Sequence, residues 1–170
     1  MPSNFRILGT GQLLTLQQRL RAAGHENIRR SMQRRIRRAA EPLRDDLQSA
    51  IRSLDISSSG RAAGKRGGPS PTTRPLRASI AEAVRISVRT SGDPGATVWV
   101  DKGRLPPDIP MGVVNRLNEG RLRHPVFGNK RRWAQQSAPA GWWDKTIRQH
   151  RPRIEREVAR VVDDVRRRLE

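Results

Sequence analysis

Arginines in one short segment carry the clearest chemistry in this sequence. Residues 29–38 contain six arginines and no acidic residue. Four of these arginines share the helix face opposite an apolar stripe: Arg30, Arg34, Arg37 and Arg38. Such a face attracts polyanions, including the phosphate backbone of DNA, and it can also pair with acidic residues of a neighbouring subunit. We take these four arginines as interface or DNA-channel candidates; a merely solvated face in a chain from a GC-rich genome is the alternative.

Residue patterns typical of enzymes are weak here. The three histidines have no metal-ligand spacing among themselves, and His124 precedes a proline in an expected loop. GRAAGKR at 60–66 differs from a phosphate-binding loop in its glycine spacing and lacks the Ser or Thr that would hold magnesium. The acid pairs at 45–46 and 163–164 lie among arginines, so local ion pairs explain them better than a two-carboxylate site. The sequence therefore predicts a non-enzymatic protein with no catalytic residue, cofactor or metal.

Aromatic residues are few and concentrated in one segment: Phe127, Trp133, Trp142 and Trp143. A group of this kind most often forms a local core. We expect Trp133 to pack with Phe127 and Trp142 or Trp143, anchoring the preceding loop to the final helix. An exposed part of the group would instead mark an interface, where Trp and Arg are enriched.

Two amphipathic stretches predict long helices. Leu13, Leu16 and Leu20 indicate a short helix over 12–23, and a longer one follows from about 25 to 54, making 12–54 a helical region. The last element, 142–169, has apolar residues on about a third of the helix circumference and arginines opposite. We expect Pro42 to kink or split the first long helix, and Pro152 to kink the last helix or delay its start.

The middle of the chain predicts a small antiparallel sheet. Residues 76–136 are interpreted in order as a short helix, a strand hairpin, a short helix ending at Gly120, and an aromatic loop: 76–84, 85–90 with 96–102, 111–120 and 121–136. Residues 55–75, rich in Ser, Gly, Pro and Thr, predict a flexible loop. The fold class is therefore α+β, as a single domain over 1–170 with both long helices packed on the sheet.

The charge balance restricts the partners. The chain has 35 basic and 16 acidic residues. Its net charge is therefore +19, and this charge is spread over both halves of the chain. Such a charge favours a polyanionic partner or a larger assembly. Cysteine is absent, which excludes a disulfide framework. No apolar run reaches the about 18 residues that would span a membrane, and the basic helices lack the aromatic anchors of a membrane-surface helix.

The most specific pattern lies in 123–143. It contains Arg123-His124-Pro125-Val126-Phe127-Gly128-Asn129, then Arg132-Trp133, then Pro139-Ala140-Gly141-Trp142-Trp143. This pattern resembles the head–tail joining, or neck, proteins of long-tailed bacteriophages (the gene-product-ten family, in its actinobacterial-phage form). The basic helical region, the stretch LRASIAEAVRISVRTSG and the VWVD strand agree, so the resemblance covers roughly 12–169 without 55–75. It implies that a set of residues acts as structural loop anchors: His124, Pro125, Phe127, Gly128, Asn129, Trp133, Trp142 and Trp143.

The resemblance implies a structural virion protein of the siphovirus neck. Such a protein forms a ring, expected to be a hexamer, between connector, adaptor or stopper proteins on the head side and tail terminator or tail tube proteins. Packaged DNA passes through the lumen without sequence-specific contacts. The expected location is the virion neck, reached from the host cytoplasm during assembly, with no membrane contact. The alternative is a free, non-enzymatic, basic nucleic-acid-binding protein of a high-GC bacterium.

Overall fold

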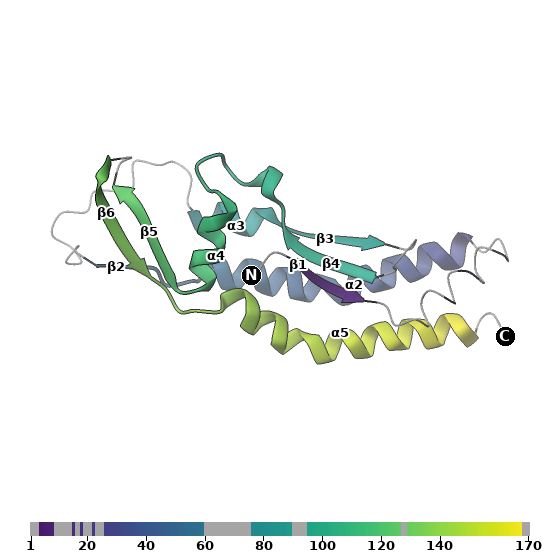
Figure 1. The fold of residues 1–170 in the computed structure, drawn as a ribbon. Coiled ribbons are helices and arrows are strands. Elements are labelled where there is room, and N and C mark those ends of the chain that lie inside the picture. The colour runs from purple at the N-terminus through teal and green to yellow at the C-terminus, as the bar shows by residue number, and fades with distance from the viewer. Residues whose placement is uncertain are drawn as a thin grey trace.

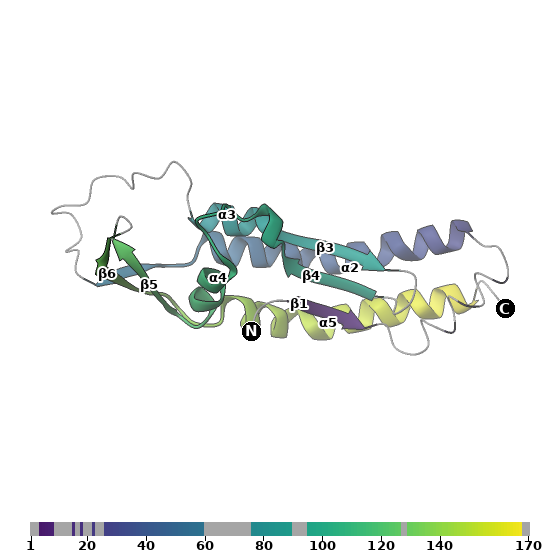
Figure 2. The ribbon, with the colours of Figure 1, turned by 45° about the horizontal axis from the view of Figure 1, so that its top comes forward.

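Two long antiparallel helices lie side by side along the molecule, and one sheet covers them while a second sheet projects beyond one end (Figures 1 and 2). The computed structural model describes residues 4–8, 15, 18, 22, 26–59, 76–89, 95–126 and 129–167. The described elements, in chain order, are β1 (Asn4–Leu8), α2 (Glu26–Arg52), β2 (Ser57–Ser59), α3 (Leu76–Ala83), β3 (Val84–Arg89), β4 (Gly95–Val100), the 3-10 helix η1 (Lys102–Arg104), α4 (Met111–Asn118), β5 (Arg121–Val126), β6 (Asn129–Ser137) and α5 (Trp142–Arg167). The α+β class expected from the sequence is confirmed.

Helix α2 buries one apolar stripe against α5, α3 and the covering sheet. The buried positions recur every three or four residues: Met32, Ile36, Ala40, Leu43, Leu47 and Ile51. Fully burying each of the larger side chains contributes about 1.5–3 kcal/mol. The helix continues through Pro42, so the predicted split does not occur. Apolar contacts on both sides of the proline hold the two halves in one helix.

Helix α5 begins with two buried tryptophans and continues as an apolar stripe. Ile154, Val158 and Val165 lie on this stripe, while Arg153 and Arg156 are exposed on the opposite face, as the periodicity predicts. The helix begins at Trp142, where the predicted element begins, so of the two effects expected of Pro152 the delayed start does not occur. Its axis bends part-way along (Figure 1). Pro152 is the only proline inside it, and we attribute the bend to the lost backbone hydrogen bond at that residue.

Sheet A, with strand order β1-β4-β3, is antiparallel throughout. Ile86 pairs with Val98 and Val84 with Val100, and these side chains face the helices. Arg85 and Trp99 pair on the outer face. The hairpin of β3 and β4 is the one expected from the alternating pattern. The third strand, β1, was not expected, and it supplies the additional pairing that an isolated hairpin lacks.

Sheet B, with strand order β2-β6-β5, corrects two expectations. Residues 121–136 form two paired strands instead of a loop. Ser57–Ser59, expected to be part of a flexible loop, pairs with the end of β6. The pairing of β6 with strands on both sides satisfies its backbone groups despite the polar sequence. The remainder of that loop, 60–75, lies outside the described residues, as does most of the helix expected over 12–23.

Candidate interface surfaces

The four α2 arginines singled out by the sequence are all exposed: Arg30, Arg34, Arg37 and Arg38. Arg30 lies at the edge of the set, where its Nε is 3.3 Å from Glu26 Oε1, and Arg29 Nη2 is 2.7 Å from the same oxygen. The hydrogen bond from Arg29 lowers the pKa of the Glu26 carboxyl, and Arg30 adds to this effect. The other three arginines have no ion-pair partner among the residues that the structure describes. They are available to bind another molecule.

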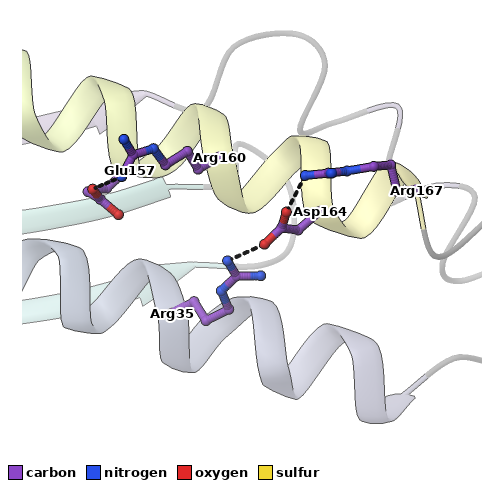
Figure 3. Close-up of polar contacts among 5 residues, drawn as sticks. All are labelled: Arg35, Glu157, Arg160, Asp164 and Arg167. Carbon is purple, nitrogen blue, oxygen red and sulfur yellow. Dashed lines mark hydrogen bonds and ion pairs between the residues drawn. The ribbon is translucent and has the colours of Figure 1, made fainter.

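Arg35 lies on a different side of α2 and joins it to α5. Its Nη2 is 2.5 Å from Asp164 Oδ2, and Arg167 Nη2 is 2.6 Å from Asp164 Oδ1 (Figure 3). The hydrogen bond from Arg35 lowers the pKa of Asp164, and the charge of Arg167 reinforces the shift. Half-exposed pairs of this kind contribute modestly to stability. Arg35 is therefore occupied within its own chain, unlike its neighbours on α2.

The local ion pairs expected for the two acid pairs form at Asp45 and Asp164, whereas Asp46 contacts another helix. Asp45 Oδ1 lies 2.6 Å from Arg44 Nη2, and Asp46 Oδ2 lies 2.6 Å from Nε2 of the largely buried His150 on α5. His25 is outside the described residues, and of His124 only the backbone in β5 is described. Within the described parts of the chain, no three His, Asp or Glu side chains converge on a position where a metal could bind.

Among the described residues, Trp133 does not join Trp142 and Trp143 in the expected aromatic cluster. Trp142 and Trp143 meet edge to face, with ring centroids 5.6 Å apart, and both belong to the buried core. Trp133 is 46% exposed on β6 and is not part of that core, so it does not anchor the hairpin to α5. The Arg123 guanidinium lies 4.8 Å from the centroid of the Trp133 ring. His124, Pro125 and Asn129 lie in strands of sheet B, described by their backbone alone; Phe127 and Gly128 lie outside the described residues.

Asn118, which the sequence analysis missed, joins sheet B to the body. This buried side chain accepts a hydrogen bond from Trp143 N at 2.9 Å and donates one to Asp144 Oδ2 at 2.7 Å. It therefore caps the start of α5 from another element. Gly120 follows with a φ of 82°, and its carbonyl accepts a hydrogen bond from Ala138 N at 3.0 Å. The asparagine that ends a helix just before a glycine was the available signal, but its partners lie 25 residues away.

The outer surface of sheet B forms a second basic surface, which we call the hairpin face. Along β6, Arg131, Trp133 and Gln135 are exposed, whereas the alternate residues Ala134 and Gln136 are partly buried. Arg121 and Arg123 of β5 are exposed too; Arg123 pairs directly with Gln135, which places both on this side of the sheet. The hairpin face is therefore made of these five residues: Arg121, Arg123, Arg131, Trp133 and Gln135. Sequence periodicity missed it because its residues are almost all polar.

Comparisons with known proteins identify no relative of this chain. The chain matches no protein-family model, no curated protein and no solved structure. Among the described residues, no helix combines the length and the apolar character needed to cross a membrane. Function must therefore be argued from the two basic surfaces and from the shape of the molecule.

Proposed function

We propose that this protein is a structural component of a bacteriophage neck, where it assembles into a ring that joins the portal-side connector to the tail around the DNA channel. The observation that carries the proposal is the projection of sheet B away from the body (Figures 1 and 2). Of its residues with described side chains, Leu122 alone belongs to the buried core. A sheet so weakly packed within its own chain is suited to contacts with neighbouring molecules. The sequence pattern at 123–143 supports the same assignment.

The α2 arginines supply the second support. Three of them lack an ion-pair partner among the described residues, and a chain of net charge +19 repels itself unless acidic surfaces or DNA lie close by. In a ring, these side chains join one copy to acidic residues of a neighbouring protein. The proposed assembly is a hexamer, with connector, adaptor or stopper proteins on the head side and tail terminator or tube proteins on the other. It occupies the virion neck after assembly in the host cytoplasm.

The test combines a particle experiment with a variant. Antibody labelling of virions from the encoding genome should place the protein at the head–tail junction, and particle images should show a closed ring there. Changing Arg30, Arg34, Arg37 and Arg38 to glutamine should leave the circular dichroism spectrum unchanged and reduce incorporation into that ring. Virions without the protein, or a gene far from portal, capsid and tail genes, would contradict the proposal.

A free, basic nucleic-acid-binding protein of a high-GC bacterium is the second candidate. The sequence of the β5–β6 hairpin favours it, because residues 121–137 include five basic residues and no acidic one. This candidate predicts a monomer or small oligomer that coats DNA in the cell, with no ring and no phage genes beside its own. Gene neighbourhood and the mass of the purified protein in solution separate the two candidates.

A further inference from the structure

We propose that the hairpin face is a binding surface for double-stranded DNA, which it contacts through backbone phosphates without reading the bases. Duplex DNA is the ligand that the proposed ring supplies, and to that extent the inference rests on the proposed function. It assigns DNA contact to sheet B and leaves the α2 arginines to contacts between proteins. The charge, the exposure and the geometry of this one face support the assignment.

The charge of the hairpin face is all of one sign. Arg121, Arg123 and Arg131 are exposed, and no acidic residue occurs anywhere in 121–137. The body of the molecule is different, because ion pairs with acidic residues recur along both α2 and α5. The next acidic residues along the chain are Glu119 and Asp144, and Asp144 is hydrogen-bonded to Asn118. Positive charge without an acidic residue in the same strands favours a polyanion as the occupant.

The geometry suits a phosphate backbone. Residues two apart on a strand lie on the same face and about 7 Å apart along it, so Arg121 and Arg123 form a row. Duplex DNA carries one negative charge per about 1.7 Å of its axis, so each arginine finds a phosphate without a fixed register. The Arg123 guanidinium lies over the Trp133 ring, and this contact orients the planar group on the exposed side of the sheet. The exposed Ser57 of β2, which pairs with Ser137, adds a neutral hydrogen-bonding group at the base of this face.

Two alternative occupants fit less well. A protein partner would need an apolar centre in the contact, and Trp133 is the one large apolar side chain exposed among the described residues. A single-stranded nucleic acid would stack several bases on several aromatic rings, and this face offers one ring with an arginine against it. A two-stranded β-ribbon, by contrast, has the width to lie along or within a DNA groove.

The decisive experiment compares two variants of equal charge. One carries Arg121→Gln, Arg123→Gln and Arg131→Gln on the hairpin face. The other carries Arg34→Gln, Arg37→Gln and Arg38→Gln on α2. Binding to a random-sequence 30-base-pair duplex is measured by fluorescence anisotropy from low to high salt. We expect the hairpin variant to raise Kd at least tenfold at about 0.1 M salt and to reduce the salt slope by about 2.7, for three lost phosphate contacts. The α2 variant should change Kd less than threefold.

Equal losses in both variants would show that net charge alone attracts DNA, and would overturn the proposal. A single-stranded oligonucleotide binding more tightly than the duplex would also overturn it. If the hairpin variant lost ring incorporation while its DNA binding stayed unchanged, the face would be a protein interface instead. A ring that fails to form with either protein contradicts the proposed function but leaves this assay interpretable, because the assay uses the free chain.

A second measurement leaves every arginine in place. The chain lacks cysteine, so Ser137→Cys on sheet B and Ser49→Cys on α2 each introduce a single labelling site. Both serines are exposed. A photo-crosslinker attached at Ser137→Cys should join the protein to the duplex, whereas the same label at Ser49→Cys should give at most a tenth of that yield. Equal yields from the two labels would overturn the assignment.

Discussion

The body of the molecule and its projecting sheet are built in opposite ways. In the body, α2, α5 and sheet A place apolar stripes against one another and form most of the described core, to which α3 and α4 also contribute. Sheet B contributes Leu122 to that core, and its outer side is exposed, polar and basic. The body is held together by its own packing. The projection is held by backbone pairing and by the junction at Asn118 and Gly120, and its outer side is exposed.

The body and sheet B also differ in the contacts that their arginines make. On the body, Arg35, Arg44 and Arg151 pair with Asp164, Asp45 and Glu155. On sheet B, Arg123 lies against an aromatic ring. Arginines that pair with acids within the chain have part of their charge compensated there, whereas the described strands β5 and β6 hold no acidic residue. Substitutions in the two regions should therefore change different properties of the protein.

The largest difference in unfolding free energy between the two regions should come from the substitution of two tryptophans. Trp143 is 2% exposed within the core, so Trp143→Ala should lower the free energy of unfolding by about 3–5 kcal/mol. Trp133 is half exposed, so Trp133→Ala should cost below about 1 kcal/mol, mainly its contact with Arg123. Urea denaturation followed by circular dichroism measures both values. Similar losses from the two substitutions would mean that sheet B belongs to the cooperative core.

How far the sequence predicts this fold depends on which faces are buried. The α2 stripe around Ile36 and Leu43 and the alternation of β3 were predictable, because burial on one side requires apolar residues at a regular period. The strands of sheet B were not predictable in this way, because Arg121–Val126 contains a proline and Leu122 alone is buried among its residues with described side chains. Their pairing depends on partner strands, and local sequence does not encode those partners.

The candidate site residues were also predictable only where the burial of one face sets a regular pattern. Exposure of the α2 arginines was predictable, because residues opposite an apolar stripe face away from the core. The place of Trp133 was not, because a tryptophan in an unassigned segment suits a core or a surface equally well. Asn118 was missed since its role depends on Trp143, which lies far along the chain but close in space.

A second test concerns the junction between the two regions. Asn118→Ala removes the acceptor of the Trp143 N–H and the donor to Asp144, so it should cost about 1–3 kcal/mol of unfolding free energy. Asn115 on the same helix is a matched control, because its buried Oδ1 has no hydrogen-bond partner in the structure. Asn115→Ala should cost clearly less than Asn118→Ala in the same denaturation assay. The reverse order would contradict the capping role of Asn118.

Gly120→Ala should have a smaller effect, concentrated in sheet B. The backbone φ there is 82°, and an added Cβ would lie 2.7 Å from the Ala138 carbonyl oxygen. A left-handed residue with a side chain costs about 1–2 kcal/mol, and the clash requires the start of β5 to shift. Amide hydrogen exchange should accelerate in β5 and β6 while α2 stays protected. Gly112→Ala, where an added Cβ meets nothing within 4 Å, should leave exchange in both regions unchanged.

The smallest effect should be the pH dependence of the α2–α5 ion pair. Arg35 holds the pKa of Asp164 below its ordinary value of 3.8. A carboxyl whose pKa is lowered in the folded state stabilises the fold above the unfolded-state pKa, and this contribution is lost as the pH falls through the folded-state value. The stability difference between wild type and Asp164→Asn should therefore be fully present at pH 7 and shrink below about pH 4. A difference that is constant from pH 7 to pH 2 would show that the ion pair contributes nothing.

The antiparallel packing of α2 and α5 also makes the molecule a lever. Each helix has 26 or 27 residues and is therefore about 40 Å long. Sheet B lies beyond one end of the pair, and α5 ends at the other (Figure 1). Since the apolar stripes and the Arg35–Asp164 contact join the two helices, they tilt as one rigid rod. A tilt of about 10° at the far end displaces the hairpin by about 7 Å, so a slight adjustment between subunits widens or narrows whatever opening the hairpins surround.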